Sequence, residues 1–77
     1  MEIQKIQNRL KRIEGQVRGV QEMVALLRSN DEITIQLSAI RSATDSLIIS
    51  IVEDEIDQAD KDRLLQLKRT VKRMIRG

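Results

Sequence analysis

Apolar residues recur along the first third of this chain at alternating intervals of three and four positions. The series runs Ile3, Ile6, Leu10, Ile13, Val17, Val20, Val24 and Leu27. An apolar residue every 3.5 positions, held for nearly four heptads, is typical of one long helix that packs against another helix. The pattern predicts a helix over about residues 2–28, ended by the turn-forming residues 29–31.

A second helix is predicted over about residues 30–59. Ser29 followed three positions later by Glu32 forms a capping box at its start. Its apolar stripe comprises Ile33, Leu37, Ile40, Thr44, Leu47 and Ile51. Around residues 46–52 apolar side chains cover most of the circumference, and a short β-strand is the alternative because Ile and Val favour strands. No glycine or proline bounds that segment, so a helix is the favoured interpretation.

A third, shorter helix is predicted over about residues 61–76. Asp60 is a suitable N-cap, and Asp62 in the first turn complements the helix dipole. Leu64, Leu67, Val71 and Met74 then line one face. The sequence therefore predicts a single all-α domain of three helices over residues 1–77.

The apolar middle of the second helix predicts an oligomer. A helix that is apolar on every side needs neighbours on every side, and one small subunit cannot supply them. The chain also has no aromatic residue, so each core position contributes only a modest apolar area. We expect two helical hairpins to pair into a four-helix bundle.

The composition excludes several classes of protein. The chain has no cysteine and therefore no disulfide, and it has no histidine, so catalysis and an enzyme function are not expected. No signal-peptide pattern is seen at the N-terminus, and unbroken apolar runs such as residues 47–49 are too short to cross a bilayer. We expect a soluble cytoplasmic protein without a cofactor.

Charge is strongly segregated along the chain. Residues 1–28 carry a net charge of +3, residues 29–60 carry −7 and residues 61–77 carry +6. One interpretation is a set of ordinary solvated helix faces. The other is that the outer segments form a basic surface for a polyanion.

Two segments of the chain resemble a known family. Residues 8–20 read NRLKRIEGQVRGV, followed by Gln21 and Met23, and residues 36–43 read QLSAIRSA, followed by Asp45-Ser46 and Glu53-Asp54. These motifs resemble the CsoR/RcnR/FrmR family, small all-α repressors that sense copper, nickel or cobalt, or formaldehyde. The similarity covers about residues 5–60, and the third helix matches only in length and amphipathic character.

The resemblance implies a specific assembly. The first two helices would form an antiparallel hairpin, two hairpins would make a dimeric bundle, and two dimers would make a tetramer with the third helix helping to join them. Such repressors bind operator DNA without a helix-turn-helix, through basic residues on a flat face of the tetramer. An effector bound at a subunit interface then releases the DNA.

The candidate DNA-binding residues follow from this resemblance and from the charge pattern. They are Lys5, Arg9, Lys11, Arg12, Arg18, Arg41, Lys68, Arg69, Lys72 and Arg73. Arginine forks fit phosphate oxygens and displace counterions. The alternative is a solvated face with intrahelical pairs, such as Arg18 with Glu14 or Glu22, and a basic end of the third helix that complements its own dipole.

The family's sensing residues are absent. The resemblance places the ligands, a Cys, a His and a Cys or His, at Asn30, Glu55 and Ala59 of this chain. Asn, Glu and Ala supply neither the soft ligands for Cu(I) nor a reactive thiol. The acidic cluster of residues 53–60 is not expected to cage a hard cation, because its carboxylates point around a helix instead of converging.

Two functions are consistent with these observations. The first is a homotetrameric DNA-binding repressor without the usual metal or thiol trigger, which is constitutive or answers to an unknown small molecule or protein. The second is a helical protein-interaction module that keeps the scaffold without binding specific DNA.

Overall fold

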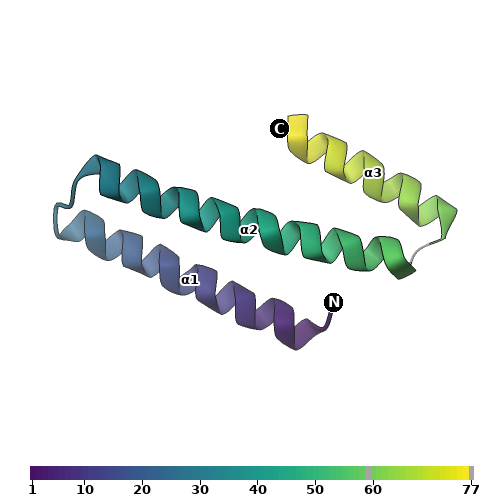
Figure 1. Cartoon of the computed structure of the whole chain (residues 1–77), viewed down its shortest axis with the longest axis horizontal. Helices are drawn as coiled ribbons and strands as arrows, with labels where there is room; N and C mark the ends of the chain where they lie inside the picture. Colours follow the sequence, from purple (N-terminus) through teal and green to yellow (C-terminus); the bar gives the residue numbers. More distant parts are fainter. Residues whose placement is uncertain (59, 77) are drawn as a thin grey trace.

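The described part of the chain folds into three helices that lie in one layer. The structure, a computed structural model, describes residues 1–58 and 60–76. Helix α1 spans Ile3–Ala25, α2 spans Asn30–Gln58 and α3 spans Lys61–Arg76. Figure 1 shows α1 and α2 antiparallel and side by side, with α3 folded back along the other flank of α2. The Cα atoms fill a slab of 51 × 30 × 12 Å, so the subunit is one helix thick.

The predicted three-helix, all-α fold is confirmed. Residues 46–52 lie inside α2, so the β-strand alternative for that segment is wrong. Bulky β-branched residues favour strands only weakly, and a long amphipathic context overrides that preference here. The end predicted for the second helix, Ala59, lies outside the described residues.

Alternate members of each apolar stripe are covered within the hairpin. The covered members are Ile6, Ile13 and Val20 on α1, and Ile33, Ile40 and Leu47 on α2. Each set repeats every seven residues, as expected for helices that meet along one heptad position. Leu47, at the centre of α2, is only 5% exposed. These contacts fix how α1 and α2 are aligned along their length.

The intervening members of each stripe are open. They are Ile3, Leu10, Val17 and Val24 on α1, and Leu37, Thr44 and Ile51 on α2. Val17, Val24 and Leu37 help to line an apolar groove of about 320 Å³ between the two helices. One subunit therefore leaves a continuous apolar surface along the hairpin.

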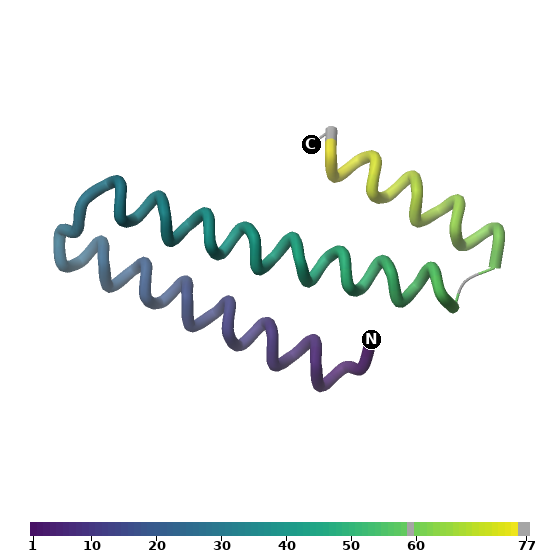
Figure 2. Tube along the Cα trace, viewed as in Figure 1, coloured from purple at the N-terminus to yellow at the C-terminus, as the bar shows by residue number. Residues whose placement is uncertain are grey.

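The turn between α1 and α2 begins before residue 28, where the first helix was predicted to end. The Arg28 amide donates to the Met23 carbonyl at 3.0 Å, and the Leu27 amide donates to the Val24 carbonyl at 3.1 Å. This pair of bonds is a Schellman motif, which ends α1 at Ala25. Figure 2 shows the chain reversing direction at this point.

Leu27 occupies the position of the Schellman motif that glycine usually takes. Its φ angle is 56°, in the left-handed region where a Cβ atom crowds the backbone. Its side chain is 90% exposed in the subunit, so no packing within the subunit offsets this strain.

The predicted capping residues start α2 and α3. Ser29 Oγ accepts a hydrogen bond from the Glu32 amide at 3.2 Å, and Asp60 Oδ1 accepts one from the Arg63 amide at 3.0 Å. Glu32 does not complete a reciprocal capping box. Its carboxylate instead accepts a hydrogen bond from Arg28 Nε at 2.6 Å, which lowers the pKa of Glu32 and raises the pKa of Arg28.

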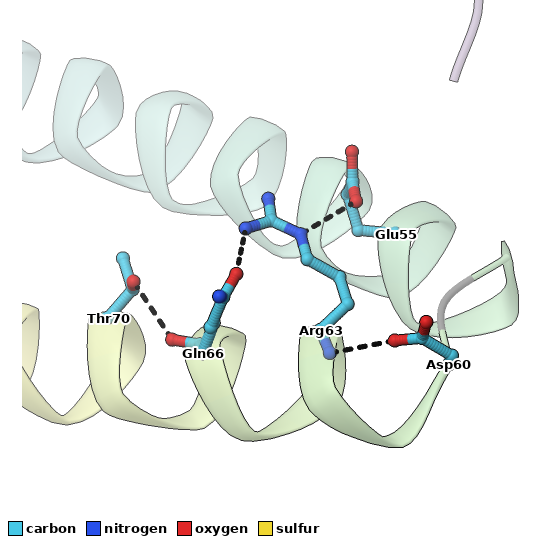
Figure 3. Close-up of polar contacts among 5 residues, drawn as sticks. All are labelled: Glu55, Asp60, Arg63, Gln66 and Thr70. Atoms are coloured by element: carbon cyan, nitrogen blue, oxygen red, sulfur yellow. Dashed lines mark hydrogen bonds and ion pairs between the residues drawn. The ribbon is translucent and has the colours of Figure 1, made fainter.

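Helix α3 is tied to α2 at the corner between them. Arg63 Nε donates to Glu55 Oε2 at 3.4 Å, and Arg63 Nη1 donates to Gln66 Oε1 at 3.2 Å. Figure 3 shows Arg63 reaching from α3 to the last turns of α2. Leu67, which is 8% exposed, is the buried contact of α3. The corner therefore combines one ion pair with a small apolar contact.

By length and composition alone, α2 is apolar enough to cross a membrane, with a mean hydropathy of 1.2 over its best window. The expectation from the sequence considered only unbroken apolar runs, which are short, and therefore did not identify α2 as a possible membrane span. The same test is passed by core helices of soluble proteins, so this single helix is weak support for a membrane span.

We predict that Leu27→Gly stabilises the protein by roughly 1 kcal/mol, because glycine adopts the left-handed conformation without a Cβ clash. For a domain of this size that corresponds to about 4–8 °C in Tm. The control is Leu26→Gly, where φ is −87° and glycine relieves nothing. Thermal unfolding followed by circular dichroism measures both, and a lower Tm for Leu27→Gly would contradict the strain argument.

Candidate nucleic-acid interface

The predicted DNA-binding residues form two groups. The first comprises Lys5, Arg9, Lys11, Arg12 and Arg18 on α1 with Arg41 on α2, and the second comprises Lys68, Arg69, Lys72 and Arg73 on α3. Within the described residues, α1 and α3 each pack on α2 and not on each other. Figure 1 shows them on opposite flanks of α2, so the width of α2 separates the two groups within one subunit.

Arg9 reaches across the hairpin and is held by two serines of α2. Its Nη1 donates to Ser50 Oγ at 3.0 Å and its Nη2 donates to Ser46 Oγ at 2.9 Å. The Ser50 hydroxyl itself donates to the Ser46 carbonyl at 3.0 Å, so a lone pair of Ser50 Oγ faces the guanidinium. These bonds fix the orientation of a half-buried cation that has no carboxylate partner among the described residues.

A polar groove opens beside Arg9. It has a volume of about 270 Å³ and is lined by Arg9, Arg12, Ile13, Gln16, Ala43 and Ser46. Arg12 is exposed and, in the part of the chain that the structure describes, forms no ion pair. Gln16 Oε1 is buried and lacks a hydrogen-bond partner. The groove therefore combines two guanidinium groups that have no carboxylate partner among the described residues with the side chain of Gln16.

Arg18 and Arg41 are placed differently. Arg18 Nη2 lies 3.4 Å from Glu14 Oε1, which is the intrahelical pair that the sequence offered as the alternative to DNA contact. Arg41 Nε lies 3.9 Å from Asp45 Oδ2 on the next turn of α2. Both pairs are strongly exposed, and such pairs contribute only about 0.3–0.5 kcal/mol. A phosphate can replace either carboxylate at little cost.

The basic residues of α3 border an apolar surface. Lys68 and Lys72 line a groove of about 500 Å³ between α2 and α3, whose other lining residues are Val52, Ile56, Leu64, Leu67 and Val71. Lys68, Arg69, Lys72 and Arg73 are all exposed. Long basic side chains at the edge of an apolar groove can cover it with their methylene groups while the charges stay in water.

The positions at which the resemblance places the sensing residues carry other side chains. Asn30 is the exposed first residue of α2. Glu55 pairs with Arg63 across the α2–α3 corner, as Figure 3 shows. Ala59 lies outside the described residues. Among residues 1–58 and 60–76, no three Cys, His, Asp or Glu side chains gather in a way that could hold a metal ion.

Sequence analysis missed Ser46 and Gln16, which line the groove, and Ser50, which accepts a hydrogen bond from Arg9. A signal for the serines existed in the hairpin register. Ala25 and Asn30 flank the turn, so residues whose numbers add to about 55 lie opposite each other, which places Arg9 near Ser46. The orphaned amide of Gln16 depends on side-chain packing and has no sequence signature.

The fold and the basic groups define a class of protein: a small all-α protein built on a long antiparallel hairpin with basic residues on its flanks. The sequence profile described as "Metal-sensitive transcriptional repressor" matches residues 2–76. The chain therefore belongs to the family of metal-sensitive transcriptional repressors, and the resemblance to the CsoR/RcnR/FrmR family is confirmed.

Two relatives illustrate this membership. The copper-sensing transcriptional repressor CsoR of Bacillus subtilis (strain 168) is 42% identical over 59 residues, which are 77% of this chain and 58% of CsoR. The structure of the nickel-responsive transcriptional regulator InrS matches with a TM-score of 0.84 and 34% identity, over 95% of this chain and 92% of the InrS chain. The chain thus spans little more than half the length of CsoR.

We predict that Arg9→Ala lowers the free energy of unfolding by about 1–2 kcal/mol, because it removes two hydrogen bonds from a charged donor. Arg12→Ala should change it by less than about 0.5 kcal/mol, since exposed residues without partners contribute little. Urea denaturation of both variants makes the comparison. Equal effects would show that the two serines do not hold Arg9.

Proposed function

We propose that this protein is a DNA-binding transcriptional repressor of the CsoR type that acts as a homo-oligomer on double-stranded operator DNA. The observation that carries the proposal is the pair of guanidinium groups of Arg9 and Arg12, which lie at one groove without a carboxylate partner among the described residues. Uncompensated arginines at a surface attract phosphates and release counterions on contact. Arg18 and Arg41 add charge that becomes available once their weak pairs open.

The open members of the apolar stripe support an oligomer. Leu10 and Val17 on α1, with Leu37 and Ile51 on α2, are exposed at heptad positions that a second hairpin would cover. Two hairpins paired along this surface form a four-helix bundle. Two such dimers would form a tetramer. In it, the basic group on α1 of one subunit and the basic group on α3 of another would form a broad cationic face.

The sensing chemistry is the part of the proposal that departs from the relatives. Asn30 and Glu55 stand where the resemblance places metal ligands, and Glu55 is already paired with Arg63. Neither residue is a soft donor. We propose that the protein does not answer to Cu(I), to nickel or cobalt, or to thiol-reactive effectors by the family's route. Its relatives are transcription regulators, so we place its activity in the cytoplasm, with no catalytic function.

The rival function, a protein-interaction module, has one observation in its favour. The groove between α2 and α3 is almost wholly apolar and is large enough for side chains of another helix. This groove lies away from Arg9 and Arg12, so the two functions predict different effects of changing those arginines.

We predict that Arg12→Ala weakens binding to DNA from upstream of the protein's own gene. The plot of log affinity against log salt should flatten by about 0.9 for each phosphate that the variant no longer neutralises. Arg28→Ala is the matched control, because it removes the same charge at the far end of the hairpin, where Arg28 is paired with Glu32. Fluorescence anisotropy at several salt concentrations measures both slopes.

The same DNA titration also tests the sensing proposal. Added Cu(I), Ni(II) or chelator should leave the affinity unchanged, whereas copper-driven release would show that other residues bind the metal. An absence of DNA binding by the wild-type protein at low salt would favour the interaction module.

We predict that Leu10→Glu breaks the oligomer, because it places a charge at an exposed heptad position that a partner hairpin should cover. Asn8→Glu, an exposed position off the stripe, is the control. Sedimentation velocity should give a dimer or larger species for the wild type and the control, and a smaller or unfolded species for Leu10→Glu. A stable wild-type monomer at micromolar concentration would refute the assembly.

A further inference from the structure

We infer that the apolar groove between α2 and α3 binds a straight-chain fatty carboxylate, and that this ligand is an effector that weakens DNA binding by occupying Lys68 and Lys72. The binding of the carboxylate stands on the groove alone, whereas its effect on DNA rests on the proposed function. The groove is separate from the one beside Arg9 and Arg12, because those residues belong to α1, on the other flank of α2.

The groove is built from aliphatic side chains with two cations at its border. Its lining residues are Val52 and Ile56 of α2 with Leu64, Leu67, Lys68, Val71 and Lys72 of α3. Apart from the two ammonium groups, these side chains carry no hydrogen-bonding atom, so a ligand with polar groups along its length would leave them unpaired. A ligand that matches this surface has an apolar body and one charged end.

The charge of the lysines selects an anion as that end. Both lysine side chains are exposed, and neither Lys68 nor Lys72 forms an ion pair within the described residues. An adjoining hollow of about 360 Å³ shares two valines with the groove and is bordered by Asp45 and Glu53. A carboxylate is therefore attracted to the lysines and repelled from the adjoining hollow, while an alkyl tail can extend along the apolar lining.

The groove has the size and the lining that suit an alkyl chain. Its volume of about 500 Å³ lies within the range of about 300–1,000 Å³ that is usual for ligand pockets. Val52, Leu64 and Val71 are half-buried and Leu67 is buried, so part of the lining is recessed between the two helices. The chain has no aromatic residue on which a flat ring could stack. A flexible straight chain therefore matches the lining better than an aromatic ligand.

Pairing of two hairpins would use a different side of α2. The exposed stripe that a second hairpin would cover comprises Leu37, Thr44 and Ile51 on this helix. At 3.6 residues per turn, Val52 and Ile56 of the groove lie roughly 100–140° around α2 from Ile51. The groove therefore remains available to a small ligand in the paired hairpins. A second subunit seated in the groove is the competing occupant.

The binding test uses the whole chain with ¹³C-labelled methyl groups, and titrates sodium octanoate, decanoate and dodecanoate below their micelle concentrations. We expect saturable NMR shifts for Val52, Leu64 and Val71. Val24 and Leu37 should not shift comparably, because they line an apolar groove without a basic residue. Each two added methylenes should tighten binding about tenfold. No saturable shift, or equal shifts at both grooves, would overturn the inference.

The role of the lysines is tested with ligands that share one tail. 1-Decanol and decyltrimethylammonium should bind at least about tenfold more weakly than decanoate, because they lack the anion. The double variant Lys68→Gln/Lys72→Gln should abolish the preference for decanoate over decanol. Arg69→Gln/Arg73→Gln removes the same charge from exposed positions of α3 outside the groove lining, and should keep the preference. A preference that survives in the lysine variant would overturn the assignment.

The effect on DNA is measured by fluorescence anisotropy at constant ionic strength. Decanoate should weaken DNA binding by the wild type severalfold, and 1-decanol should not. Ile56→Gln keeps every basic residue, so it should bind DNA like the wild type and lose the response to decanoate. Ile35→Gln, at an exposed position of α2 outside this groove, should keep the response.

The outcomes separate the ligand site from the proposed function. If decanoate binds but the wild-type protein binds no DNA, the proposed function fails and the ligand site stands. If DNA binding is unaffected by bound decanoate, the effector role is overturned and the proposed function survives. Sedimentation velocity identifies the competing occupant: a smaller species for Ile56→Gln, with no decanoate binding by the wild type, would assign the groove to a second subunit and overturn the inference.

Discussion

The packing of one heptad position of α1 against one of α2 determines the arrangement of the rest of the subunit. Ile13 and Val20 meet the side of α2 that carries Ile40 and Leu47. Because this contact repeats every seven residues, it fixes the register of the hairpin along its whole length. That register brings Arg9 opposite Ser46 and Ser50 and opens the polar groove beside them. The geometry of the groove is therefore a consequence of aliphatic packing.

Two of the polar contacts between helices have different electrostatic consequences. At the groove, Arg9 is bound by neutral hydroxyls, so its charge is oriented but not cancelled. At the α2–α3 corner, Arg63 pairs with the carboxylate of Glu55, which partly compensates its charge. The first arrangement leaves a cation ready for an anionic ligand. The second arrangement holds α3 against α2. It uses Glu55, a position at which the resemblance to the family would place a metal ligand.

Much of the fold could be predicted from the sequence because helix formation and capping depend on nearby residues. The 3–4 spacing, Ser29 and Asp60 locate the helices, and their hydrogen bonds are present in the structure. The strained Leu27 could not be predicted, since a leucine gives no sign of a left-handed conformation. For the candidate site, the sequence identified Arg9 and Arg12 by type. The two serine bonds and the buried oxygen of Gln16 arise from contacts between helices, which spacing along one helix does not encode.

A layer of helices only one helix thick has little interior of its own. Many large apolar side chains that could oppose chain entropy remain exposed, and only another molecule can shield them. If the proposed oligomer forms, its association stabilises the folded subunit, and the folded fraction rises with protein concentration. At low protein concentration, newly made subunits would remain accessible to proteases until they associate with a second subunit. Cellular abundance would then act as a threshold below which the proposed oligomer does not accumulate.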